Sequence, residues 1–454
     1  MLNALANTIS TFYGFGMPSD YNLSWIGQFI KLLIESFGSI GVGIIIFTVI
    51  LKLITLPLDI YSRVSTKKMA LKQEAMKPEL EKLQRQYANN KELYQKKMSA
   101  LYKKQGVSML SSCLPMIVTI VFFIIVINQF TAYSNYTNLT MINAMSDSYT
   151  KAVVNYNETN GKNVLNVVEN SDGTYTVTLN EDEVYSETAL GDYSITKTES
   201  GYIASDINKL GALVELYNGK GFTKTTVGTS GRIIKNEDGI YSFNDAIFTG
   251  SDEERNKIVS AEVAEFAYNL YIEENILPVA RQASAATYRE MAPSFLWVKN
   301  LWVPDLPWRH PVFSSIKDYN FKNINDGIEG EFEEITHDLA EEKSAPNGYL
   351  ILVVLSIGIM LASQLVMQKT QKTQMQLSSV DGQGAQTQKM MTWMMPLMFG
   401  VFAFIYNASF SLYMIISSAL STISTVIINK IVEKNFKRKA EEEAEKNDKR
   451  FFKK

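Results

Sequence analysis

Lys52 is the residue of this chain whose type and position most clearly require an explanation. It lies inside residues 43–58, a run that is apolar enough to cross a bilayer. A lysine at the middle of a membrane helix costs about 2.5–3.5 kcal/mol on insertion scales, so its ammonium group needs water or a polar surface. We predict a polar, water-accessible cavity facing Lys52, with snorkelling to the cytosolic interface as the alternative.

Other polar residues in apolar segments could line such a cavity. Thr48 and Thr55 flank Lys52, and Gln364 lies in a later segment, where a buried amide needs partners. In the last apolar segment a stripe of hydroxyls falls within about one third of the helix circumference: Ser411, Ser418, Thr422 and Thr425. The alternative is that these hydroxyls only pack helices or bond to their own backbone.

The inventory of metal-binding and nucleophilic residues is poor. The 454 residues include one cysteine, Cys113, within an apolar run, and two histidines, His310 and His337. One cysteine excludes an intramolecular disulfide, and so few cysteines and histidines argue against a metal site or a Cys/His nucleophile. We therefore predict no enzyme activity, no catalytic residues, no metal and no cofactor, and we expect no cleavable signal peptide.

Five nearly charge-free apolar segments must position the polar residues. Their lengths suit helices that cross about 30 Å of hydrocarbon. The sequence therefore predicts a mainly α, polytopic membrane protein with five transmembrane helices, at residues 38–61, 107–130, 348–368, 390–406 and 408–432.

The placement of charge predicts the orientation of these spans. Residues 63–104 hold 12 lysines and arginines against 4 acids, a net charge of +8, and residues 369–389 and 430–454 carry +2 and +4. Residues 131–346 hold 17 basic and 33 acidic residues, a net charge of −16. Because positive loops stay in the cytosol, the N-terminus is predicted outside and the C-terminus inside.

The segments between the spans complete the predicted organisation. Residues 24–37 carry an apolar stripe typical of an interfacial amphipathic helix, after an extracellular segment at 1–23. Residues 62–106 are predicted as a cytosolic helical hairpin that turns near Asn89-Asn90. The remaining segments are an extracellular segment at 281–347, a cytosolic loop at 369–389 and a basic cytosolic tail at 433–454.

Residues 131–280 are predicted as an inserted extracellular α+β domain. Turn signals at 171–174 and 236–239 and the alternating run at 175–179 favour strands, and 252–275 has helical periodicity. The domain contains no catalytic constellation.

The cytosolic hairpin carries a candidate recruitment surface of five basic residues: Lys77, Lys82, Arg85, Lys96 and Lys97. The alternative is a solvated hairpin that is attracted to anionic lipid.

Several segments, in this order along the chain, resemble the YidC-type membrane protein insertases: residues 51–57, 76–84, 100–107, 113–116, 294–305, 390–400 and 407–413. Together they cover residues 24–130 and 290–432. Lys52 stands where the family usually has arginine, which keeps the charge but loses the planar fork of donors. The long inserted domain departs from the family pattern, so the resemblance assigns it no role.

The resemblance implies an insertase that moves nascent membrane proteins into the lipid bilayer through a positively charged groove open to cytosol and lipid. It implies the bacterial plasma membrane as location, the general secretion translocon and the ribosome as partners, and a monomer as the active form. The groove residues that we expect are Lys52, Thr48, Thr55, Gln364, Trp393, Ser411, Ser418 and Thr422. Trp393 has a second interpretation as an interfacial anchor.

Two other classes of protein remain open. A small-solute transporter or channel could use an intramembrane lysine, although we count no paired membrane carboxylate and five spans do not divide into two equal repeats. A membrane-anchored surface binding protein would depend on the inserted domain, so deletion of residues 135–275 would abolish its function.

Overall fold

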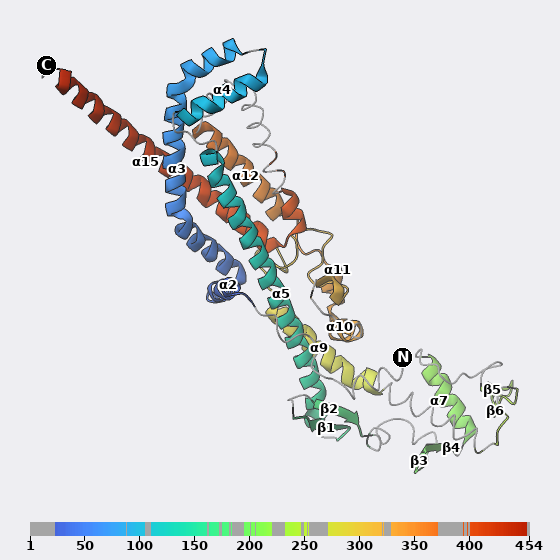
Figure 1. The fold of residues 1–454 in the computed structure, drawn as a ribbon. Coiled ribbons are helices and arrows are strands. Elements are labelled where there is room, and N and C mark those ends of the chain that lie inside the picture. The colour runs from blue at the N-terminus through green and yellow to red at the C-terminus, as the bar shows by residue number, and fades with distance from the viewer. Residues whose placement is uncertain are drawn as a thin grey trace. The chain divides into compact units, whose positions relative to one another are not determined.

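The structure is a computed structural model whose chain divides into two compact units (Figure 1). The core unit comprises residues within 20–138, 292–313 and 341–454, and the appended unit comprises residues within 139–291 and 314–340. The structure describes residues 23–87, 89–104, 110–160, 163–171, 175–180, 195–199, 201–204, 206–219, 232–246, 249–251, 271–319, 321, 328–370 and 400–451, with the single positions 183, 253, 394 and 397.

Helices build the core unit. They are α2 (Trp25–Glu35), α3 (Ile40–Gln86), α4 (Lys91–Lys104), the first part of α5 (Leu110–Asn160), α11 (Ala340–Ser344), α12 (Ile351–Thr370) and α15 (Ala408–Phe451). Within the described residues two stretches are long and apolar enough to cross a membrane, Ile40–Ser65 of α3 and Ala408–Glu442 of α15, and Ile351–Met367 of α12 is a shorter apolar helix. Of the predicted fourth span at 390–406, residues 390–393, 395–396 and 398–399 lie outside the described residues.

Helix α3 continues well beyond the predicted end of the first span at residue 61. Pro57 and Pro78 lie inside it, although a proline removes one helix hydrogen bond and costs about 3 kcal/mol in a helix interior. Residues 66–86 are rich in Lys, Glu, Ala, Leu and Gln, which are strong helix formers, so the helix persists after the apolar pattern has ended. The span and the first arm of the hairpin are therefore one helix.

The hairpin is closed by a small apolar cluster. Met76 and Leu80 of α3 are buried against Met98, Leu101 and Tyr102 of α4. At the turn the side chain of Asn90 accepts a hydrogen bond from the Leu93 amide at 3.1 Å, which caps the start of α4.

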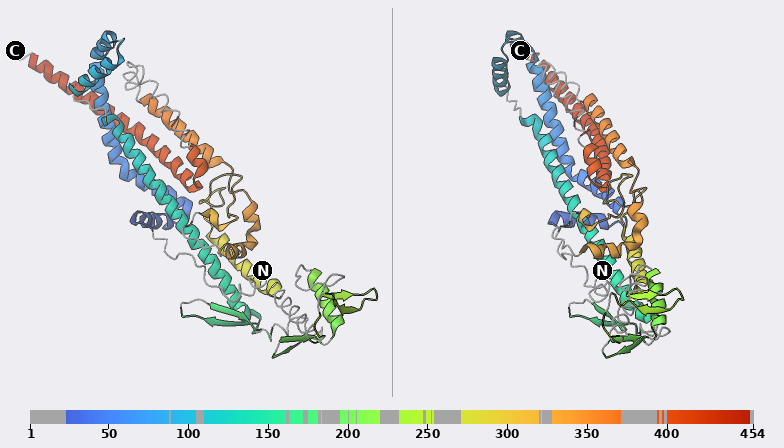
Figure 2. Two further views of the ribbon diagram at one scale, coloured as in Figure 1. Left: turned by 45° about the vertical axis from the view of Figure 1, so that its right-hand side comes forward. Right: turned by 90° about the vertical axis from the view of Figure 1, so that its right-hand side faces the viewer.

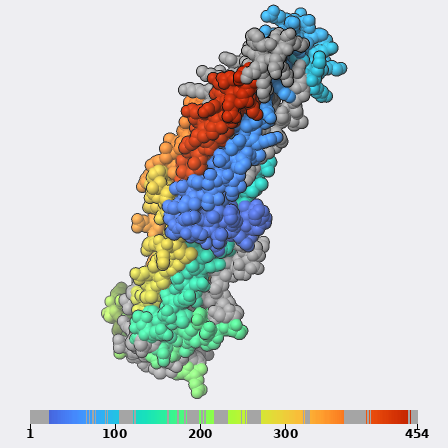
Figure 3. Space-filling view, turned by 90° about the vertical axis from the view of Figure 1, so that its left-hand side faces the viewer, coloured from blue at the N-terminus to red at the C-terminus, as the bar shows by residue number. Residues whose placement is uncertain are grey.

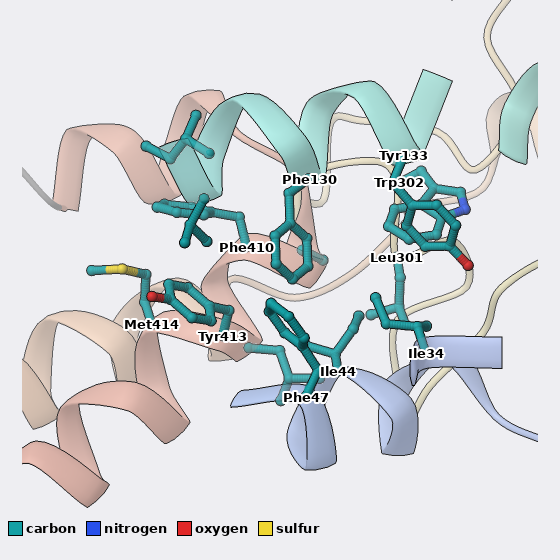
Figure 4. Close-up of a cluster of buried hydrophobic side chains, with 14 of the residues drawn as sticks. Ile34, Ile44, Phe47, Phe130, Tyr133, Leu301, Trp302, Phe410, Tyr413 and Met414 are labelled. Carbon is teal, nitrogen blue, oxygen red and sulfur yellow. The ribbon is translucent and has the colours of Figure 1, made fainter. Parts of the chain in front are cut away.

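An aromatic cluster holds α3, α5 and α15 together (Figure 4). The ring of Phe130 packs edge-on against Phe47, with centroids 5.6 Å apart, and lies 5.7 Å from the ring of Tyr413. The ring of Phe410 lies 6.2 Å from that of Tyr413 and is tilted by 33° to it. Because fully buried aromatic side chains contribute several kcal/mol each, this cluster fixes the register of the three helices.

Helix α2 packs its buried residues Gly27, Ile30 and Ile34 against the rest of the core unit. Its apolar residues Trp25 and Leu32 remain 79% and 64% exposed. This exposed apolar surface suits the interfacial position that the sequence predicts for residues 24–37.

Two buried polar side chains, those of Asn347 and Asp305, hold the chain immediately before α12 in place. The amide of Asn347 donates to the carbonyls of Asn300, Val303 and Pro304 at 3.0–3.1 Å. The carboxylate of Asp305, which has no exposed surface, accepts hydrogen bonds from the amides of Tyr349 at 2.8 Å and Leu352 at 2.6 Å. Asp305 therefore caps the N-terminus of α12.

The appended unit combines helices with three separate antiparallel hairpins. Its strands are β1 (Leu165–Glu169), β2 (Tyr175–Leu179), β3 (Ile195–Thr198), β4 (Gly201–Ala204), β5 (Ile233–Lys235) and β6 (Tyr241–Phe243), paired as β1-β2, β3-β4 and β5-β6. The helices are the end of α5, α7 (Ile207–Gly219), η2 (Ile272–Ile276), α9 (Leu277–Met291), η3 (Ile316–Tyr319), α10 (Ile328–Ile335) and η4 (His337–Leu339).

Two local predictions for this unit are confirmed. Residues 175–179 form strand β2, and residues 236–239 form the turn between β5 and β6, where Gly239 has a φ of 79°. Of the predicted helix at 252–275, residues 254–270 lie outside the described part of the chain.

A buried ionic network joins three helices of the appended unit. Arg281 of α9 donates two hydrogen bonds to Glu334 of α10, at 2.7 and 2.9 Å, and one to Glu273 at 3.1 Å. The hydroxyl of Tyr149 of α5 donates to the same Glu334 at 2.9 Å. Burial lowers the pKa of Arg281, but its carboxylate partners outweigh that effect and the pKa is raised.

Candidate functional site: a polar seam between three helices

The ammonium group of Lys52 has two partners near the interface of α3 and α15. Its Nζ atom donates to Oδ2 of Asp59 at 2.5 Å and to Oγ of Ser421 at 2.8 Å. The side chain of Lys52 is 14% exposed and that of Asp59 is 37% exposed. Lys52 therefore extends along α3 toward its C-terminal end, and a carboxylate compensates its charge.

Further polar contacts continue from this ion pair. Arg63 of α3 donates to the hydroxyl of Thr425 on α15 at 2.9 Å. The hydroxyls of Ser363 on α12 and Thr422 on α15 lie 2.5 Å apart. We call this set the polar seam: Lys52, Asp59 and Arg63 of α3, Ser363 of α12, and Ser418, Ser421, Thr422 and Thr425 of α15.

Helical periodicity explains why these residues share a surface. Asp59 and Arg63 lie seven and eleven residues after Lys52, and both spacings return to nearly the same face of a helix with 3.6 residues per turn. The α15 residues Ser421, Thr422 and Thr425 lie three, four and seven residues after Ser418, spacings that also keep them on one side of a helix. Figures 2 and 3 show α15 packed beside α3, and Figure 2 shows α12 beside α15.

Four of the expected groove residues form two groups: Ser418 and Thr422 belong to the seam, and Thr48 and Thr55 bond to the backbone of their own helix. Ser418 and Thr422 belong to the seam, where the Ser418 carbonyl accepts hydrogen bonds from Thr422 at 2.8 Å and from Ser363 at 3.4 Å. Thr48 is 1% exposed and bonds to the Ile44 carbonyl of its own helix. Thr55 likewise bonds to the Lys52 carbonyl at 3.2 Å.

The remaining expected groove residues are Ser411, Gln364 and Trp393. Ser411 is fully buried, and its hydroxyl has no hydrogen-bond partner among the described residues. Gln364 is half-buried on α12. Trp393 lies outside the described residues, as does the side chain of Lys77, whereas the other four hairpin residues are exposed: Lys82, Arg85, Lys96 and Lys97.

Sequence reasoning missed Asp59, Arg63 and Ser421. The statement that no paired membrane carboxylate exists was wrong, because Asp59 lies within the apolar stretch Ile40–Ser65 and pairs with Lys52. Asp59 lies two residues before the predicted end of the first span at residue 61. The available signal was its spacing of two helical turns from Lys52.

Among the described residues no group of three or more His, Cys, Asp or Glu side chains could hold a metal ion. The seam offers hydrogen-bond donors and acceptors and paired charges. Such groups can bind and hydrate a polar segment without changing a covalent bond.

These features define a helical membrane protein with a charged, hydrogen-bonded seam between its apolar helices. Comparison with known families then gives its identity at the level of the family. The 60Kd inner membrane protein family matches residues 32–165 and 277–435, and the chain belongs to this family, the family of YidC.

Curated relatives carry the name membrane protein insertase YidC. The protein of Fusobacterium nucleatum subsp. nucleatum is 37% identical over 106 residues, which are 22% of this chain and 49% of that protein. The proteins of Chloroherpeton thalassium and Geobacter sulfurreducens are 37% and 36% identical over 100 and 118 residues, 22% and 24% of this chain and 16% and 22% of theirs. The chain thus spans at most about half the length of these relatives. No solved structure matches the chain.

The family match leaves a gap inside the range that the sequence predicts as an inserted domain, residues 131–280. Residues 166–276 fall between the two matched ranges. In the structure α5 ends at Asn160, and the hydroxyls of Tyr156 and Tyr271 lie 3.4 Å apart. The chain therefore leaves and re-enters the matched part at neighbouring points of the appended unit.

Proposed function

We propose that this chain is a membrane protein insertase that moves nascent membrane proteins into the bilayer through a positively charged hydrophilic groove. The observation that carries the proposal is the position of Lys52. It lies in the middle of a span-length apolar stretch and contacts the hydroxyl of Ser421 on α15 and the carboxylate of Asp59 on its own helix. Placing a cation at that depth costs free energy, so a lysine found there is a candidate functional residue.

The proposed arrangement has five spans, with the N-terminus outside and the C-terminus in the cytosol, in a bacterial plasma membrane. The net charge of +8 over residues 63–104 and of −16 over residues 131–346 supports this orientation. The groove would be open to cytosol and lipid, with the polar seam on its wall.

The seam would lower the barrier for a hydrophilic terminus that crosses the hydrocarbon. The hydroxyls of Ser421 and Thr422 and the carbonyl of Ser418 would replace part of the water that the terminus loses, and the charge of Lys52 would attract its acidic groups. The apolar part of the substrate then leaves sideways into lipid. Substrate hydrophobicity drives the step, aided by a membrane potential worth about 2.3 kcal/mol per charge per 100 mV.

Partners follow from the charged cytosolic parts. Helix α15 continues to Phe451, and exposed basic residues such as Lys434 and Lys437 suit contact with ribosomal RNA phosphates, although Arg438 is paired with Glu442 at 3.6 Å. The exposed hairpin residues Lys82 and Lys96 provide the proposed recruitment surface. We propose that the chain acts as a monomer, alone or with the general secretion translocon.

The test is insertion into liposomes that contain the purified full chain. A short single-span substrate should become protease-protected, whereas trapped small solutes should not leak faster than from empty liposomes. Replacement of residues 161–270 by a short Gly/Ser linker should retain most of the insertion. Solute flux without insertion would contradict the proposal, and loss of insertion in the linker variant would favour a function of the inserted domain.

A further inference from the structure

Lys52 is already neutralised by a carboxylate of its own helix. Oδ2 of Asp59 lies 2.5 Å from Nζ of Lys52, and Ser421 supplies a third polar group at 2.8 Å. A substrate carboxylate that approaches Lys52 must therefore compete with the carboxylate of Asp59. This feature bears on which substrates the proposed groove accepts.

The two members of the pair differ in exposure. The Lys52 side chain is 14% exposed, and that of Asp59 is 37% exposed. In the proposed orientation Asp59 also lies nearer to the cytosol, because it is seven residues closer to the cytosolic hairpin. Asp59 can exchange a partner for water at low cost, whereas an unpaired Lys52 would be a poorly solvated charge. The pair therefore opens only when another anion compensates Lys52.

Arg63 offers Asp59 a second cation. It lies four residues further along α3, the spacing at which helical side chains are neighbours, and its present contact is the Thr425 hydroxyl at 2.9 Å. After release from Lys52, the Asp59 carboxylate can thus remain close to a positive charge. The arrangement of two cations around one acid makes an exchange of partners feasible.

We propose that Asp59 sets the substrate selectivity of the groove by acting as an internal competitor for Lys52. This inference rests on the proposed insertase function. A translocated tail with Asp or Glu must displace Asp59, which reduces the advantage that such a tail would gain from Lys52. A neutral tail passes the seam while the Lys52–Asp59 pair stays closed. Asp59 therefore widens the range of accepted tails toward neutral ones.

The experiment compares two single-span substrates that differ only in their translocated tail, which carries either two glutamates or two glutamines. Both are inserted into liposomes by the full-length chain, and the ratio of acidic to neutral insertion is measured. Asp59→Asn should raise this ratio about two- to fivefold, the effect of removing one partly exposed ion pair. Asp59→Glu keeps the charge and should restore the wild-type ratio.

A double variant separates competition from a change in packing. Lys52→Gln combined with Asp59→Asn removes both charges of the pair, so the ratio should fall well below that of Asp59→Asn alone. An unchanged ratio in Asp59→Asn, or an equal rise in the double variant, would overturn the inference. If the wild type inserts neither substrate, the proposed function itself fails.

Discussion

Ser421 accepts a hydrogen bond from Lys52 at 2.8 Å, across 369 positions of the sequence. The contact joins α3 to α15, the two helices with span-length apolar stretches. It shows that the cation of α3 faces another helix of the core unit. The hydroxyl stripe of α15 is therefore part of the environment of Lys52, and the following predictions test that environment and the elements that hold it.

Removal of the Ser421 hydroxyl should weaken insertion. Ser421→Ala takes one of two polar partners from Lys52, and a hydrogen bond to a charged group is worth about 1.5–3 kcal/mol when buried. We expect a loss of insertion of about threefold or more, smaller than that of Lys52→Ala. The liposome assay measures it. Ser424→Ala, on the same helix and outside the seam, should leave insertion unchanged, and equal losses in both variants would contradict a specific role.

A side chain at Gly43 should separate α2 from α3. A Cβ atom there would lie 2.1 Å from the backbone oxygen of Ile34, which cannot move without shifting the helix. Gly43→Ala should therefore destabilise the protein by about 1–3 kcal/mol, seen as a lower melting temperature in detergent. Gly358→Ala is the control, because a Cβ at Gly358 meets no atom within 4 Å. A stable Gly43→Ala protein would show that the two helices pack less closely.

Loss of the Asp305 carboxylate should loosen the start of α12. Asn at this position would place a donor against the amides of Tyr349 or Leu352, which Asp305 now accepts. We expect Asp305→Asn to cost about 1–3 kcal/mol, measured by chemical denaturation in detergent. Asp318→Asn, at an exposed position, should have no effect. Faster hydrogen exchange in residues 349–355 would locate the damage at the helix N-terminus.

The appended unit should lose local stability in acid. Hydrogen bonds that Tyr241 and Lys235 donate, at 2.5 and 2.9 Å, lower the pKa of Glu215 below its usual value. A carboxylate with a lowered folded-state pKa stabilises above its unfolded pKa of about 4.3 and loses that effect as the pH falls through the folded value.

Hydrogen exchange in the full chain, corrected for intrinsic rates, tests this expectation. Protection of residues 207–219 and 241–243 should fall as the pH drops below about 4.3. In Glu215→Gln protection should be lower at neutral pH and should no longer change over this range. An unchanged pH profile in this variant would show that Glu215 does not link β6 to α7.

Local patterns predicted local structure well. The alternation of residues 175–179 predicted strand β2, and the Asn-Glu-Asp-Gly signal at 236–239 predicted the turn between β5 and β6, because both depend on neighbours in the chain. Lys52 was singled out because a charge in an apolar run is visible without a fold. The family assignment was also reached from ordered short segments, and the family match confirms it.

Contacts between distant segments were not predictable in the same way. Nothing near Ser421 distinguishes it from Ser417 or Ser424, and only the packing of α15 on α3 selects it as the partner of Lys52. Asp59 was missed as a partner of Lys52 because their contact depends on α3 continuing as one helix through Pro57. The end of a helix depends on the helix propensity of the whole segment, so a short motif does not predict it.

The most direct test of the account is growth of insertase-depleted cells that carry variants of Lys52. Arg should restore growth because it keeps the charge, Ala should restore it partly or not at all, and Glu should be least effective because it places a second acid beside Asp59. All variants must be present in the membrane at equal amounts. The account predicts the order Lys, Arg, Ala, Glu, and equal rescue by Lys52→Glu would contradict a groove that works through positive charge.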